Sequence, residues 1–194
     1  MKVFWAEGFD GATVDDLVAG TGVGRPSLYA TFGDKEALFM RCLEHYGRSV
    51  GALAVQALYT APDIRGALCG FLRQAIESAT GEGTPRGCLM ACVVPSVNAA
   101  KVREFSARAL AGMEGIIEKR LQDAVCAGEL PPGFPCAARS RQVIGTSLAL
   151  SLRARIGAPR EVLFADADDG VALILSATCV ERLHDERPHD EREN

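Results

Sequence analysis

The stretch Thr13–Leu38, with the sequence TVDDLVAGTGVGRPSLYATFGDKEAL, constrains the fold of this 194-residue chain more than any other. Thr13 is expected to cap a helix, because its hydroxyl can accept a hydrogen bond from a free N–H group of the first turn. Apolar residues recur at helical spacing from Val14 onward. Residues 20–22, Gly-Thr-Gly, are expected to end that helix and to supply a turn.

A second short helix is expected to begin at residue 24 or 25. Pro26 fits only in the first turn of a helix, where its missing N–H group does no harm. Val23 is predicted to be the buried plug of the turn, and Leu28 and Phe32, four residues apart, are predicted to face inward. A helix, a short turn and a second helix with an exposed polar face make a helix-turn-helix, whose second helix suits the DNA major groove.

The composition favours an all-α protein. Nearly half of the residues are hydrophobic, only 6% are aromatic, and no run of alternating β-branched residues indicates strands. No segment approaches the roughly twenty uninterrupted apolar residues of a membrane span. Because the N-terminal residues also lack the apolar region of a secretion signal, we expect a cytoplasmic protein with no membrane association.

The N-terminal region resembles the DNA-binding domain of the tetracycline-repressor (TetR) family over about thirty-five residues. The residues that match the family pattern are Phe4, Gly8, Phe9, Ala12, Thr13, Val14, Leu17, Val18, Gly22, Val23, Leu28, Tyr29, Phe32, Lys35, Glu36 and Leu38. The resemblance implies a helix-turn-helix DNA-binding domain followed by a larger helical domain for ligand binding and dimerisation. It also implies a repressor that a small apolar ligand releases from a palindromic operator in double-stranded DNA.

The resemblance carries DNA contacts over to the second helix and its neighbours: Thr13, Arg25, Ser27, Tyr29, Thr31 and Lys35. The Tyr29 hydroxyl is expected to reach a phosphate. Arg25 could form paired hydrogen bonds to a guanine edge, or it could bind a phosphate, and both alternatives stay open. Pro26 can make only apolar or shape contacts, for which a thymine methyl group is the expected target.

Three segments follow from these patterns: residues 1–48 as the DNA-binding domain, 49–183 as the ligand-binding and dimerisation domain, and 184–194 as a disordered, charged tail. The first helix, read as Lys2–Glu7, is shorter than in the family, so we expect it to be truncated at Met1. Asp34 is expected to cap a connector helix running to about Ser49.

The larger domain is predicted to contain helices over about 50–59, 64–80, 101–128, 136–156 and 159–183, with a buried helix over 87–94 and a break near 166–170. The last two long helices combine apolar and small residues, which suits close packing against copies of themselves. The resemblance implies that this pair forms a homodimer interface.

Six residues of the larger domain are candidates for lining a ligand cavity: Phe71, Gln74, Met90, Asn98, Phe105 and Met113. Polar residues on otherwise apolar stretches often orient a ligand in such a pocket. An ordinary core role for these side chains is the alternative.

The cysteines and histidines argue against a metal site. The chain has seven cysteines at irregular spacing, no CxxC and three histidines, so buried free thiols are expected. Cys88 and Cys92, four residues apart on one helical face, could sense electrophiles or oxidants, although core packing is the preferred interpretation. No catalytic set, GxGxxG or P-loop occurs, so neither an enzyme nor a cofactor is predicted.

The charge of the first 48 residues motivates a second hypothesis. They contain five Lys and Arg against seven Asp and Glu, whereas DNA-binding domains usually carry a basic surface. The alternative is a ligand- or thiol-sensing dimer that no longer binds DNA.

Overall fold

The computed structural model describes residues 1–176, and within that range every regular element is a helix. This confirms the all-α prediction. The predicted tail at 184–194 and the end of the last predicted helix, to residue 183, lie outside the described residues.

Three short helices form the N-terminal head: α1 (Lys2–Gly11), α2 (Val14–Thr21) and α3 (Arg25–Phe32). Thr13 caps α2 as predicted. Its Oγ1 accepts from the Asp16 N–H at 3.2 Å, and its own N–H donates to Asp16 Oδ2 at 2.9 Å, which is a complete capping box. The helix continues through Gly20 and Thr21, contrary to the prediction, and ends at Gly22, which has a left-handed φ of 69°.

The buried plug predicted in the turn is wrong. Val23 is 41% exposed, whereas Leu17 and Leu28 are buried in the head core. These two leucines fill the space between α2 and α3, so the turn itself stays at the surface.

The helix α1 is interrupted inside its span. Gly8 has φ 78° and ψ 176°, a backbone conformation that side chains with a Cβ rarely adopt. The turn before it corresponds to the helix predicted over Lys2–Glu7. After Gly8 the chain resumes a helical course to Gly11.

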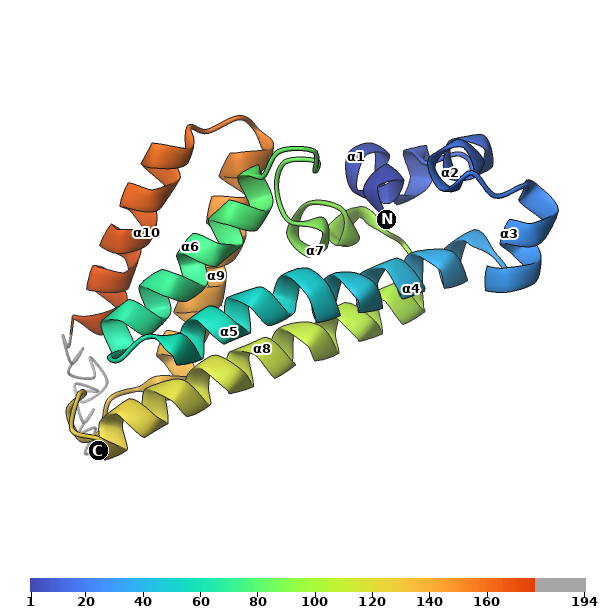
Figure 1. The fold of residues 1–194 in the computed structure, drawn as a ribbon. Coiled ribbons are helices and arrows are strands. Elements are labelled where there is room, and N and C mark those ends of the chain that lie inside the picture. The colour runs from blue at the N-terminus through green and yellow to red at the C-terminus, as the bar shows by residue number, and fades with distance from the viewer. Residues whose placement is uncertain (177–194) are drawn as a thin grey trace, which may run out of the picture.

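A long helical rod leads out of the head (Figure 1). It consists of α4 (Lys35–Tyr46), the π-helical turn η1 (Gly47–Gly51) and α5 (Ala52–Thr60). Asp34 caps α4, because its Oδ1 accepts from the Ala37 N–H at 2.7 Å. The longest helix, α8 (Ala100–Cys126), runs alongside the rod.

Three further helices pack against one another: α6 (Ile64–Thr80), α9 (Cys136–Arg155) and α10 (Arg160–Leu175). The break predicted near 166–170 is wrong, since α10 is continuous there. Asp166 pairs with Arg153 of α9, and Asp168 pairs with Arg73 of α6. These acidic side chains therefore bind neighbouring helices instead of marking a loop.

The helix predicted over 87–94 is also wrong in extent and place. Only α7 (Leu89–Cys92) and the 3-10 turn η2 (Val94–Ser96) form. Gly87, with φ 82°, stops a helix on one side, and Pro95 limits it on the other. Leu89 and Val93 pack into the core cluster of the head, with Phe4 and Phe39, and not into the centre of the larger domain.

Candidate functional site

The outer face of α3 presents a compact set of polar side chains. Leu28 points inward and is 4% exposed, so it fixes the rotation of this helix on the head core. The rest of the helix surface carries the exposed residues Arg25, Pro26, Ser27 and Thr31, together with Tyr29, which is 38% exposed. The structure thus leaves the predicted DNA-contact residues of α3 exposed, while Leu28 packs into the head core.

Arg25 is positioned by the preceding helix. Its Nη2 donates to Asp15 Oδ1 at 2.9 Å, and both side chains are exposed. A surface ion pair of this kind contributes about 0–1 kcal/mol. The guanidinium can therefore exchange this carboxylate for a phosphate or a base edge at little cost.

Thr13 and Lys35 are already engaged within the head. The Thr13 hydroxyl donates to Asp16 Oδ2 at 2.5 Å, and this hydrogen bond keeps the pKa of Asp16 below its ordinary value. Lys35 Nζ lies 4.9 Å from the centre of the Phe9 ring and 3.4 Å from the carbonyl oxygen of Asp10. Lys35 therefore links α4 to α1, whereas Thr13 caps α2 through Asp16 of the same helix.

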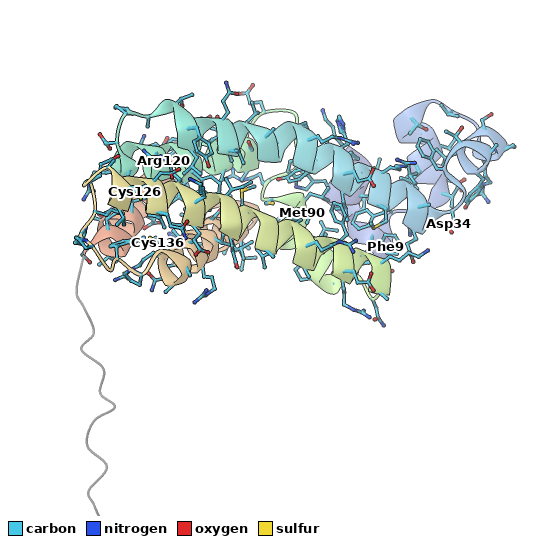
Figure 2. The ribbon with its side chains drawn as sticks, turned by 90° about the horizontal axis from the view of Figure 1, so that it is seen from below. Phe9, Asp34, Met90, Arg120, Cys126 and Cys136 are labelled. Carbon is cyan, nitrogen blue, oxygen red and sulfur yellow. The ribbon has the colours of Figure 1, made fainter. Side chains whose placement is uncertain are left out.

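A cavity of about 910 Å³ lies below the head, among α4–α9. Its volume is in the range typical of small-molecule sites. Most of its lining is apolar, and it includes the exposed residues Leu110 on α8 and Leu148 and Leu152 on α9. Met90, which lines the cavity, lies near the middle of the molecule, between Phe9 and Asp34 of the head and Cys136 at the other end (Figure 2).

Four of the six predicted cavity residues line this space: Phe71, Met90, Phe105 and Met113. The other two are not on its wall. Gln74 Nε2 donates to Ser78 Oγ at 3.5 Å, and the exposed Asn98 accepts from Arg103 Nη1 at 2.9 Å. Polarity within an apolar stretch was therefore a poor guide here, because both amides have local partners.

A tyrosine and a cysteine meet at the head end of the cavity. The Tyr46 hydroxyl donates to Cys88 Sγ at 3.2 Å, and both residues line the cavity. Burial raises the pKa of the Tyr46 phenol above its usual value. No spacing signal in the sequence links residues 46 and 88.

Cys92 does not have the surroundings of a reactive thiol. Burial raises the pKa of its thiol, and its Sγ lies 3.7 Å from the Ser151 carbonyl oxygen. A thiol held in its neutral form is a poor nucleophile. The geometry therefore favours packing over sensing at Cys92. In residues 1–176, the structure contains no group of three or more His, Cys, Asp or Glu able to hold a metal ion.

The model for "Bacterial regulatory proteins, tetR family" matches residues 1–42. The HTH-type transcriptional repressor ComR of Escherichia coli (strain K12) is 29% identical over 84% of this chain and 79% of its own length. A solved structure of a putative TetR transcriptional regulator from Rhodococcus sp. RHA1 is 31% identical, with 90% of this chain and 94% of that one covered and a TM-score of 0.62. The TetR family regulator CifR, solved as a cysteine mutant complexed with 26-bp operator DNA, is 27% identical, with 88% and 91% covered and a TM-score of 0.81.

The fold, the exposed face of α3 and these relatives define a helix-turn-helix transcriptional regulator, not an enzyme. The chain belongs to the TetR family of bacterial regulatory proteins. Across residues 1–176, no helix combines the length and apolar character needed to cross a membrane.

Proposed function

We propose that this protein is a homodimeric repressor whose α3 helices bind an operator and whose cavity takes a small apolar ligand that releases the DNA. The exposed face of α3, held in place by buried Leu28, is the observation that carries this proposal. The operator complex of CifR and the repressor role of ComR support it. Such a protein would work in the cytoplasm, where bacterial DNA lies.

On DNA, Arg25, Ser27, Tyr29 and Thr31 would reach bases and phosphates, and Pro26 would make an apolar contact. Thr13 and Lys35 would contact phosphate at the ends of the motif. In this assignment residues 1–48 form the DNA-binding domain, and residues 49–183 bind the ligand and dimerise.

The dimer would form through α9 and α10. Several large apolar side chains on or beside these helices are exposed in the single chain: Leu148, Leu152, Ile156, Val162 and Leu173. Exposed apolar surface of this kind commonly marks an interface between copies. Two heads related by a twofold axis would read half-sites one DNA turn, or a multiple of it, apart.

Arg25→Ala is expected to weaken binding to the operator by about 1–3 kcal/mol, because the variant loses a charged hydrogen-bond donor on the groove-facing helix. The measurement is the fluorescence anisotropy of a labelled DNA fragment from the region upstream of the gene. Arg65→Ala, which removes the same charge from the exposed face of α6, is the matched control and should bind like the wild type. Wild-type binding no tighter to this fragment than to random DNA at low salt would refute the proposal.

Gly112→Phe is expected to weaken binding of the amphiphilic dye 1-anilinonaphthalene-8-sulfonate about tenfold, because the added ring would occupy part of the cavity. Gly112 lines the cavity, and a Cβ added there meets no atom within 4 Å, so the variant should fold. Gly115→Phe is the control: it lies on the same helix, also has open space, and does not line the cavity. Equal loss of dye emission in both variants would show that the dye binds elsewhere.

A further inference from the structure

The first helix of the head is held by one arginine of α9. Because Gly8 interrupts α1, the last carbonyl groups of the preceding turn lack the partners that a continuous helix would provide. Arg155 supplies donors instead: Nη1 lies 3.0 Å from the Trp5 oxygen, and Nη2 lies 3.0 Å from the Ala6 oxygen. A cation at the C-terminal end of a helical segment is also favoured by the helix dipole.

Arg155 and Trp5 also hold the turn that leads into α7. Arg155 Nη1 donates to the Arg86 oxygen at 3.1 Å, and Trp5 Nε1 donates to the Gly87 oxygen at 2.9 Å. Trp5 is 1% exposed, so its N–H group has no access to water as an alternative partner. A Cβ on Gly87 would lie 2.9 Å from Arg155 Cβ, so the turn is packed directly against α9.

This junction borders the cavity. Cys88, next to Gly87 in the chain, accepts the hydrogen bond from Tyr46, and both residues form part of the cavity wall. The Tyr46 ring meets the Trp5 ring edge-on, with centres 5.2 Å apart and an angle of 86° between the planes. On α9, Leu152 lines the cavity one turn before Arg155. A molecule in the cavity therefore touches residues that contact Trp5 or precede Arg155 by one turn.

We propose that Trp5, Gly87 and Arg155 form a latch that reports the state of the cavity to the DNA-binding head through α1. With the cavity empty, the latch fixes α1 to α9. A ligand pressing on Tyr46, Cys88 and Leu152 shifts the Gly87 turn and the end of α9, and the hydrogen bonds to Trp5 and Ala6 weaken together because one guanidinium shares them. The latch rests on the proposed function in that the head it holds while the cavity is empty is the one expected to bind DNA.

Hydrogen exchange of the peptide covering residues 1–11 tests the latch without DNA. Arg155→Gln is expected to exchange about tenfold faster than the wild type there, as expected for loss of a charge-assisted hydrogen bond. Saturating the wild type with 1-anilinonaphthalene-8-sulfonate should increase the exchange rate of the same peptide. In Arg155→Gln the dye should cause no further increase in this rate. Arg153→Gln is the matched control, since Arg153 is on the same helix end but pairs with Asp166 and makes no contact with α1.

Trp5→Phe provides a second variant if Arg155→Gln does not fold, because it keeps an aromatic ring but removes the N–H donor to Gly87, together with the second ring of the indole. It should also exchange faster in the 1–11 peptide. Exchange in Arg155→Gln equal to that in Arg153→Gln, or no response of the wild type to the dye, would overturn the latch.

The latch and the repressor function can each be refuted without the other. If α1 responds as expected but the protein does not bind its upstream DNA, the latch stands and the repressor function falls. If the protein binds this DNA and the dye releases it while exchange of residues 1–11 stays unchanged, the repressor stands and another route carries the signal.

Discussion

Phe39→Ala is expected to lower the free energy of unfolding by about 3–5 kcal/mol, the usual cost of emptying a buried phenylalanine site. Phe39 is 0% exposed, and its ring centre lies 5.0 Å from that of Phe4 and 5.1 Å from that of Phe9. These contacts join α4 to both halves of α1, on either side of Gly8. Removing the ring should therefore loosen the whole head, including α3, which packs on the same core.

Thermal unfolding followed by the emission of Trp5, the one tryptophan of the chain, measures this effect. The midpoint should fall by about 10 °C, since a chain of this size loses about 2–4 °C per kcal/mol. Leu53→Ala on α5 serves as the control, because Leu53 is 47% exposed and should cost far less. A Phe39→Ala midpoint within a degree or so of the Leu53→Ala midpoint would contradict the assignment of Phe39 to the core of the head.

Gly87→Ala is expected to cost about 2–5 kcal/mol of folding free energy, from two sources. A positive φ costs a residue with a Cβ about 1–2 kcal/mol, and overpacking adds about 1–3 kcal/mol. The added Cβ would lie 2.8 Å from Cys92 Sγ and 2.9 Å from Arg155 Cβ, distances that real Cβ atoms essentially never show, and 3.0 Å from the Ser151 oxygen. The turn must then move away from α9.

Gly83→Ala separates the two sources. Gly83 has a similar φ of 71°, but a Cβ there meets nothing within 4 Å. It should show the backbone cost alone, so urea unfolding should place its midpoint between those of the wild type and Gly87→Ala. Equal midpoints for the two variants would mean that the turn before α7 is not closely packed.

Local patterns predicted the helices of the head and the caps of the connector well. Thr13 and Asp34 cap helices as predicted, because a capping side-chain oxygen lies only two or three residues from the N–H group whose hydrogen bond it accepts. Leu28 faces inward because helical spacing alone sets which side of α3 is apolar. The exposed face that carries Arg25 and Tyr29 follows from the same spacing.

Patterns failed at positions where nearby residues limit a helix, satisfy a polar group or fill a space that apolar spacing alone does not reveal. The run around Leu89 was long and apolar enough for a buried helix, but Gly87 and Pro95 limit it to four residues. Gln74 and Asn98 looked like polar groups in a pocket, yet their neighbours satisfy them. Val23 was predicted to be buried, but it is exposed because Leu17 and Leu28 occupy the core between α2 and α3.

The sequence by itself determined the helix-turn-helix, since its caps, turn and apolar spacing act within a few residues of one another. Only the tertiary structure decided which side chains enclose the cavity and which ones join it to the head. Trp5 and Gly87 are 82 residues apart in the chain, and Arg155 and Trp5 are 150 apart. No periodicity records such pairs, because they form only when α1, α7 and α9 pack together.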